Sequence, residues 1–350
     1  MPGSTFGKIF KITTWGESHG KGVGVVIDGC PPRIPLDEAA IQSMMDRRKP
    51  GSSIASTARK EPDTAVIMSG VFEGMTTGTP IMIMMYNKDA DSSAYKAYAD
   101  LFRPGHGDIT YNAKYGIRDW RGGGRASARE TAARVAAGGV AKAILDREQI
   151  RVLAYTTELG GVKAEKRDFD VMNQNQFLCP DTDAAKEMEK RVAGVRKKGD
   201  SLGGIVEILA SGCPVGLGEP VFDKLDGELA KALMSIGAVK GVEIGAGFEA
   251  AGKLGSENND PITPEGFLTN NAGGILAGIS NGDDITARVA VKPIPSITVE
   301  QKTTDRFGNP QTISTKGRHD ISAIPRINVV CEAMVCIVLA DHLLRQRIIN

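Results

Sequence analysis

The stretch "RDWRGGGRASARETAARVAAGGVAK", residues 118–142, decides the fold, because it joins a glycine loop to a helix with little side-chain bulk. The three glycines at 122–124 allow backbone conformations that other residues avoid. Ser127 followed by Glu130 predicts a capping box, and therefore a helix from Ser127 to about Leu145. The alanines and glycines of this helix predict close packing on several sides.

The same stretch has the features of an anion site. A glycine loop before a helix N-terminus offers free N–H groups and the positive end of the helix dipole. Fork-shaped donors for phosphate or carboxylate come from four side chains, Arg121, Arg125, Arg129 and Arg134. The pattern is neither a P-loop nor a dinucleotide-binding G-x-G-x-x-G unit. A solvated helix start that carries arginines is the alternative that this pattern leaves open.

Composition narrows the class of protein. The 350 residues are 41% hydrophobic and 24% charged, as in ordinary globular chains. A net charge of +1 argues against a nucleic-acid-binding protein and favours a small anionic ligand at a local positive patch. The five cysteines form no C-x-x-C pair and predict reduced core thiols in a cytoplasmic protein. No membrane segment is expected, because the longest apolar run, 329–340, is short and contains Glu332.

The order of elements predicts an α+β fold. Helices and strands are mixed without regular βαβ alternation, which favours antiparallel sheets in a single domain over residues 1–350. Strands are expected near 7–14, 22–28, 80–87, 203–218, 238–251 and, as a pair around an Asn281-Gly282 turn, 273–293. Helices are expected at 35–49 with Asp37 as cap, around 184–195 and after Pro325, and residues 296–320 are expected to form a loop.

Three of the four histidines, His19, His106 and His319, lie in loops rich in glycine or arginine. Their spacing fits no zinc motif, so no metal site is expected. Imidazoles beside arginines suit proton transfer near an anionic substrate, although a structural hydrogen bond is the usual role of a loop histidine. Asp341 lies on an apolar helix face, where burial would raise its pKa; an ion pair with Arg345 is an equal alternative.

Eight segments, in order along nearly the whole chain, together resemble chorismate synthases. They are "GESHGKG" (16–22), "DRRKPG" (46–51), "FRPGHGD" (102–108), "YGIRDWRGGGRASARETAARVAAG" (115–138), "ALMSIGAVKGVEIG" (232–245), "NAGGILAGIS" (271–280), "KPIPSI" (292–297) and "KGRHD" (316–320). That family converts 5-enolpyruvylshikimate 3-phosphate to chorismate and phosphate, using reduced FMN without net redox change. The resemblance implies a β-α-β sandwich, with helices between two antiparallel sheets, and a homotetramer.

The resemblance also implies roles for individual residues. His19 would assist the departing phosphate, His106 would protonate reduced flavin near its N1 edge, and Asp341 would take part in proton handling around flavin N5. FMN contacts are implied at Arg125, Ser127, Gly237, Ala238, Ala277, Lys292, Pro293, Ser296 and Arg318. Contacts with the substrate's anionic groups are implied at Ser18, His19, Arg48, Arg103, Arg129 and Arg318. The chemistry itself calls for a cofactor, because no side chain supplies electrons reversibly.

The chain departs from the family pattern at a few positions. Ile54 stands where relatives commonly carry arginine, and Arg59 or Lys60 could compensate. Whether the protein reduces its own flavin with NADPH is open; the absence of an added reductase domain favours an external reductant. Two rival functions remain: a nucleic-acid clamp built on 118–129, with steeply salt-dependent binding, and a flavin oxidoreductase that consumes its reductant.

Overall fold

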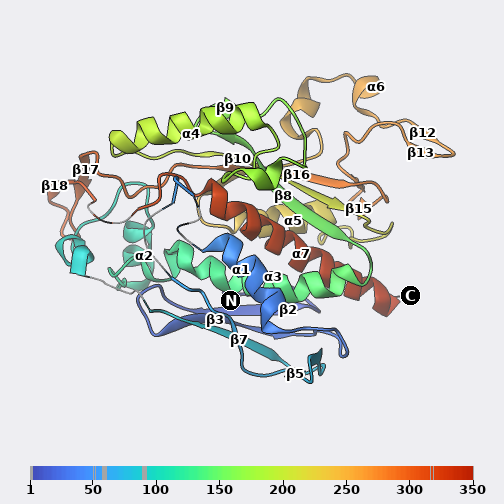
Figure 1. Cartoon of the computed structure of the whole chain (residues 1–350), viewed down its shortest axis with the longest axis horizontal. Helices are drawn as coiled ribbons and strands as arrows, with labels where there is room; N and C mark the ends of the chain where they lie inside the picture. The colour runs from blue at the N-terminus through green and yellow to red at the C-terminus, as the bar shows by residue number, and fades with distance from the viewer. Residues whose placement is uncertain are drawn as a thin grey trace.

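Two five-stranded antiparallel sheets enclose a layer of helices in the computed structural model (Figure 1). The model describes residues 3–49, 51, 53–56, 61–88, 93–315, 317 and 319–349. The first sheet has the order β1 (Thr5–Phe6), β2 (Lys11–Gly16), β3 (Gly22–Asp28), β7 (Ile81–Tyr86) and β4 (Val66–Ile67). The second has the order β11 (Val239–Ile244), β16 (Ile285–Val291), β10 (Gly204–Ser211), β8 (Arg151–Leu159) and β9 (Val162–Lys163). The predicted α+β sandwich is therefore the observed fold.

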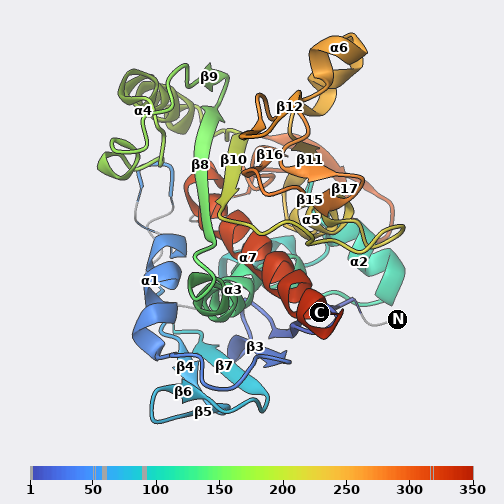
Figure 2. The same ribbon diagram turned by 90° about the vertical axis from the view of Figure 1, so that its right-hand side faces the viewer.

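Four helices fill the space between the sheets: α1 (Glu38–Arg48), α3 (Thr131–Asp146), α5 (Leu225–Met234) and α7 (Ile324–Ile349). Helix α3 packs on β3 and β7, whereas α7 packs on β8 and β10, and the two helices lie side by side (Figure 2). Gly138 makes this approach possible: a Cβ there would lie 2.6 Å from Ala333 Cα. The low bulk of residues 131–142 thus lets one helix touch both a sheet and a second helix.

Helix α7 is long and apolar enough to cross a membrane, but its whole apolar window is buried inside the protein. A buried core helix of a globular protein can be as long and as apolar as a membrane-spanning helix. Pro325 lies in its first turn, where a missing backbone N–H costs no intrahelical bond. We therefore assign α7 to the central helix layer.

The remaining elements are shorter and lie around the sandwich. Helix α4 (Thr182–Lys197) contacts β9, and Asp181 caps it as Asp37 caps α1. The other helices are α2 (Asp108–Tyr115) and α6 (Gly255–Asn258), and the 3₁₀ segments are Ser93–Tyr98, Gly124–Ala126, Ala128–Glu130, Met172–Gln174 and Gly247–Gly252. Small hairpins pair β5 (Val71–Phe72) with β6 (Met75–Thr76), β12 (Ile262–Thr263) with β13 (Gly266–Phe267), β14 (Ile275–Leu276) with β15 (Ile279–Ser280), and β17 (Gln301–Thr304) with β18 (Pro310–Ile313).

Three local predictions were wrong. The Asn281-Gly282 pair joins no hairpin; the turn lies at Ala277-Gly278 between β14 and β15, and β16 pairs instead with β10 and β11. Residues 296–320 contain the hairpin β17–β18, which is largely exposed and so lacks the apolar alternation of a half-buried strand. The strand expected over 7–14 begins only at Lys11, after a turn at Gly7 with φ +88°.

Candidate active site

A cleft of about 1180 Å³ lies beside the glycine loop. Residues 122–131 line it together with segments that are distant in the sequence, including 105–108, 235–238, 294–296 and 319–320. Seven arginines line the cleft in the described part of the chain: Arg48, Arg103, Arg118, Arg125, Arg129, Arg134 and, at the start of α7, Arg326. A concave surface with many guanidinium groups is suited to a ligand that carries several negative charges.

The glycine loop leads into the helix more gradually than predicted. Residues 122–124 have φ values of +70°, +98° and +55°, all in the left-handed region. Two 3₁₀ turns follow, and α3 begins at Thr131 rather than at Ser127. Ser127 Oγ accepts the Arg129 N–H at 3.3 Å, but the Glu130 carboxylate binds Arg134 Nε at 2.8 Å instead of closing the capping box. Ser127 is the predicted N-cap, but of the 3₁₀ turn Ala128–Glu130 that leads into α3. The predicted capping box was wrong, because the Glu130 carboxylate accepts hydrogen bonds from Arg134 and Thr14.

Two of these glycines lie directly against the two histidines that were predicted to be catalytic. A Cβ on Gly122 would lie 2.6 Å from His19 Nε2, and a Cβ on Gly123 would lie 2.7 Å from His106 Cε1. Both distances are shorter than any real side chain permits, so glycine is required for contact as well as for φ. The loop therefore brings together His19 and His106, which are 87 positions apart in the sequence.

Ser18 and His19 lie at the margin of this cleft. They are not lining residues themselves, but both are in reach of Gly122, which lines it. Ser18 is buried, and its hydroxyl has no hydrogen-bond partner among the described residues. A buried hydroxyl without a partner is costly, so a ligand that supplied one would be stabilised there.

His106 belongs to a buried charged cluster that the sequence did not identify. Its Nδ1 lies 3.0 Å from Asp108 Oδ1, and Arg103 donates to the same carboxylate from Nε at 2.8 Å and from Nη2 at 3.0 Å. Arg118 Nη1 lies 3.1 Å from Asp108 Oδ1. Burial by itself would raise the pKa of Asp108, but hydrogen bonds from Arg103 and His106 hold it well below its usual range.

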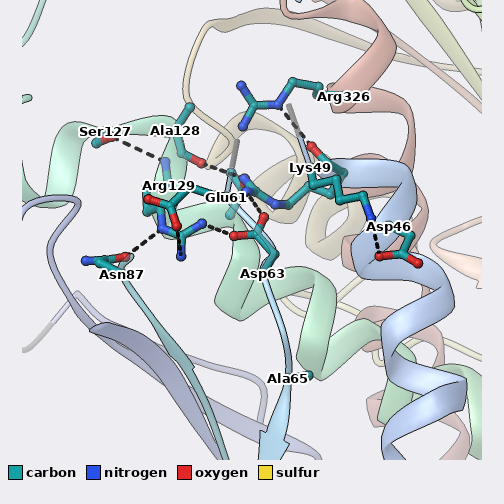
Figure 3. Close-up of polar contacts among 12 residues, drawn as sticks. Asp46, Lys49, Glu61, Asp63, Ala65, Asn87, Ser127, Ala128, Arg129 and Arg326 are labelled. Carbon is teal, nitrogen blue, oxygen red and sulfur yellow. Dashed lines mark hydrogen bonds and ion pairs between the residues drawn. The ribbon is translucent and has the colours of Figure 1, made fainter. Parts of the chain in front are cut away.

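Arg48 and Arg129 share a second buried carboxylate, Asp63. Figure 3 shows Asp63 beside Arg129. Arg48 Nη2 donates to Asp63 Oδ2 at 2.5 Å and Arg129 Nη1 donates to Oδ1, while Arg129 Nε donates to Asn87 at 2.8 Å. Asp63 is completely buried and has φ +48°, a region that non-glycine residues rarely occupy. Such local strain is typical of positions whose geometry the surrounding structure enforces.

Each of these two arginines has a buried N–H group without a hydrogen-bond partner among the described residues. Arg48 Nε has no hydrogen-bond partner among residues that the structure describes; Arg129 Nη2 has only an ion-pair contact, 3.9 Å from Glu61. Burial lowers the pKa of Arg48 to about 10, although the charge of Asp63 opposes this shift. Arg48 therefore stays charged at neutral pH and, like Arg129, faces the cleft.

The predicted FMN residues are only partly gathered at the cleft. Arg125, Ser127, Gly237, Ala238, Lys292 and Ser296 line it. Arg125 donates to Thr14 Oγ1 at 2.7 Å and to the Gly16 carbonyl at 3.1 Å, and Lys292 donates to the Gly105 carbonyl. Pro293 and Ala277 do not line the cleft; Ala277 lies in the β14–β15 turn. Arg318, Arg59 and Lys60 fall outside the described residues.

Asp341 is buried on α7 and is not a lining residue of the cleft. Its carboxylate accepts backbone N–H groups of Lys8 at 3.1 Å, Ile9 at 2.6 Å and Phe10 at 2.9 Å, and it pairs with Arg345. The ion pair with Arg345, one of the two alternatives from sequence, is therefore present. These contacts indicate that Asp341 anchors the chain segment between β1 and β2 to α7.

Ile54 packs, half-buried, against the hydrophobic core and does not line the cleft. Its backbone N–H donates to Gln176 Oε1 at 2.6 Å.

The site also contains residues that the sequence analysis did not single out. Arg326 lines the cleft and donates to Asp320 at 2.6 Å. The only sequence signal for Asp108 was its place two residues after His106 in "RPGHGD".

Comparison with known proteins gives one family. The family model described as chorismate synthase matches residues 10–344. The chorismate synthase of Desulfosudis oleivorans is 70% identical over 100% of this chain and 99% of its own length, and that of Syntrophobacter fumaroxidans is 61% identical over 98% of each chain. A solved structure titled "Crystal Structure of Chorismate Synthase" aligns with a TM-score of 0.77 at 33% identity, covering 97% of this chain and 93% of the other.

Proposed function

The chain belongs to the chorismate synthase family, and we propose that its cleft binds reduced FMN beside 5-enolpyruvylshikimate 3-phosphate and eliminates phosphate to form chorismate. The C–O bond to phosphate breaks, a hydrogen leaves C6, and the ring gains a second conjugated double bond. When bound, reduced FMN supplies electron density transiently and ends the cycle reduced. The observation that carries this proposal is the meeting of His19, His106 and the arginines around one glycine loop.

The residues present fit such a pair of anions. Buried donors without hydrogen-bond partners among the described residues, Arg48 Nε and Ser18 Oγ, lie in or beside a cleft of sufficient size. The substrate carries a phosphate and two carboxylates, for which Arg48, Arg103 and Arg129 provide fixed cationic partners. Arg125 and Lys292, which also line the cleft, are the cations that we assign to the flavin.

The two histidines would handle protons at the reacting atoms. His19, beside the orphan hydroxyl of Ser18, would stabilise the leaving phosphate, and His106 would exchange a proton with the flavin. Preorganised arginines would hold the developing negative charge of the phosphate without further rearrangement. A direct role for Asp341 stays a prediction from the resemblance, because its contacts here are to the β1–β2 segment and Arg345.

The test is a count of products per reduced flavin under strict anaerobiosis. We expect one equivalent of pre-reduced FMN to support many equivalents of chorismate and phosphate and to remain reduced at the end. A ratio that stops near one would identify the flavin as a stoichiometric reductant and favour the oxidoreductase alternative. Binding of the oxidised and reduced flavin, measured by fluorescence, should weaken on Arg125→Ala more than substrate binding does.

The protein would act as a homotetramer. Exposed Val221 and Phe222 support self-association; they lie on a segment that is hydrogen-bonded to β15 through Gly216 N and the Ser280 carbonyl at 3.0 Å. Sedimentation should give a tetramer that Phe222→Ser weakens.

Reduced flavin would come from a separate reductase. Anaerobic incubation with NADPH and FMN should therefore leave the flavin oxidised, and bleaching of its absorbance would contradict the external source.

A further inference from the structure

Asp108 connects the predicted proton-transfer residue to the scaffold. It is the first residue of α2, is buried, and follows His106 by two positions, so the two side chains reach each other across Gly107. Arg103 fixes the carboxylate through three hydrogen bonds, from its backbone N–H at 3.1 Å and from Nε and Nη2. Arg103 therefore holds the Asp108 carboxylate in place independently of its contact with the histidine.

The contacts at Nδ1 decide which nitrogen of His106 carries the proton in the neutral ring. Asp108 Oδ1 can only accept a hydrogen bond, and it lies 3.0 Å from Nδ1. Arg103 Nη2 can only donate, and it lies 3.2 Å from Nδ1 while donating to Asp108 Oδ1 at 3.0 Å. If Nδ1 lacked a proton, its lone pair would face a carboxylate oxygen. The arrangement therefore favours Nδ1–H donating to Asp108.

The opposite edge of the ring faces the ligand space. His106 lines the cleft, and a Cβ on Gly123 would lie 3.0 Å from its Nε2. In the described part of the chain, the hydrogen bonds to the ring are all made at Nδ1. Nε2 is thus the nitrogen that is left for a proton exchange with a bound molecule.

We propose that Asp108 is a positioning residue that holds His106 in the Nδ1–H tautomer and makes Nε2 the atom that exchanges a proton in the cleft. This inference rests on the proposed function for the role of His106, but the tautomer is a property of the protein alone. Asp108 acts through His106 and does not itself touch the reacting atoms.

The first test is nitrogen NMR of the protein labelled with ¹⁵N-histidine, recorded without ligand at a pH where His106 is neutral. His106→Ala assigns its signals among those of the four histidines. We expect a protonated Nδ1 and an unprotonated Nε2 in the parent protein. Asp108→Ala should move the proton to Nε2, because Arg103 Nη2 is then the remaining partner of Nδ1. A parent protein with Nε2–H, or a variant with an unchanged tautomer, would overturn the proposal.

Two further variants keep this test decisive. If Asp108→Ala does not fold, Asp108→Asn takes its place in the test, because the asparagine amide can still accept a hydrogen bond from Arg103. This variant should give a tautomer ratio between those of the other two proteins. Asp181→Asn is the matched control, because Asp181 is an equally buried carboxylate that caps α4 away from the cleft. The control should leave the His106 signals in place; a shift there equal to that of Asp108→Asn would indicate a general loss of structure and contradict the assignment.

A double-mutant cycle separates positioning from an independent effect. Asp108→Asn should lower kcat by roughly ten- to hundredfold, which is less than the roughly 10²–10⁴-fold that general acid–base assistance itself typically contributes. In a His106→Ala background the same change should lower kcat by less than about twofold, because groups that act as a unit are not additive. Losses that multiply would overturn the proposal. If His106→Ala alone leaves turnover intact, its role in the proposed function fails, and the NMR result still decides the tautomer.

Discussion

At the scale of single residues, two buried carboxylates, Asp63 and Asp108, each pair with two arginines of the cleft. Asp63 joins Arg48 to Arg129, and Asp108 joins Arg103 to Arg118 and His106. Burial alone would raise the pKa of Asp63, yet both guanidinium groups lower it overall, so it is ionised at neutral pH. The carboxylates keep neighbouring guanidinium groups from repelling one another and fix their direction before a ligand binds.

The variant Ile54→Arg tests the prediction that an arginine at position 54 would contact the substrate. Because Ile54 packs against the core outside the cleft, Ile54→Arg should not lower the substrate KM. We expect it to lower the free energy of unfolding by about 1–3 kcal/mol, since a half-buried position would receive a charge. Ile54→Val, the control, should cost about 0.5–1.5 kcal/mol. Urea unfolding and steady-state kinetics measure both, and a lower KM for the arginine variant would show that position 54 reaches the substrate.

His342 should make the fold sensitive to mild acid. Burial first, and then the charge of Arg345, lower its pKa to about 4, although Asp341 opposes the shift. The folded state thus keeps the ring neutral while the unfolded chain protonates near pH 6.5, so its contribution to stability is complete above 6.5 and is lost as the pH falls toward 4. Between pH 7.5 and 5.0 this contribution should fall by about 2 kcal/mol.

His342→Leu should remove that part of the pH dependence and leave the stability at pH 7.5 equal or higher. Neither ring nitrogen of His342 has a hydrogen-bond partner among the described residues, so leucine of similar size loses no polar contact there. Urea unfolding at the two pH values measures the difference. An identical pH dependence in parent and variant would mean that the pKa of His342 is the same in the folded and the unfolded protein.

At the scale of elements, the contact between α3 and α7 depends on missing side-chain atoms. Gly138→Ala should destabilise the fold by about 1–3 kcal/mol despite the better helix propensity of alanine, because the new Cβ would overlap Ala333. Gly194→Ala on α4 is the matched control: its Cβ would have no atom within 4 Å, so it should stabilise by up to about 1 kcal/mol.

Adding Ala333→Gly to Gly138→Ala should recover only part of the loss, because glycine removes the Ala333 methyl group but keeps Cα, which would still lie 2.6 Å from the new Cβ. Thermal unfolding of the four proteins measures the coupling between positions 138 and 333. A Gly138→Ala variant as stable as the parent would mean that α3 and α7 separate freely, and the close helix packing inferred from residues 131–142 would be wrong.

At the scale of the whole molecule, we propose that residues 1–350 form one domain. The hydrophobic core is continuous through both sheets and the helices between them, within the part of the chain that the structure describes. Unfolding should therefore be a single transition. Two probes measure the urea midpoint of unfolding. Fluorescence reports on Trp15 in β2 and on Trp120 beside the glycine loop, and hydrogen exchange reports on β10 in the second sheet. Both probes should give the same midpoint. Two separate midpoints would divide the chain into two domains.

The sequence by itself determined the classes of element, the glycine loop and the family. Apolar periodicity located α4, the cap at Asp37 located the start of α1, and glycine-rich motifs located the loops, because these signals lie within a few residues of one another. Positions such as His19, His106 and Arg129 could be proposed from motif alone. Local interpretation was wrong where a residue or strand has a partner outside the expected motif. Glu130 pairs with Arg134 and Thr14 instead of closing a capping box, and β16 pairs with β10 and β11.

Only the tertiary structure decided which charges meet. Asp63 and Asp108 became candidates because buried guanidinium groups lie against them, and Asp341 was placed on the backbone of residues 8–10, more than 330 positions away. The physical reason is that burial and pairing energies depend on groups brought together by packing of α7, α3 and both sheets, whereas propensity and periodicity describe near neighbours in the chain.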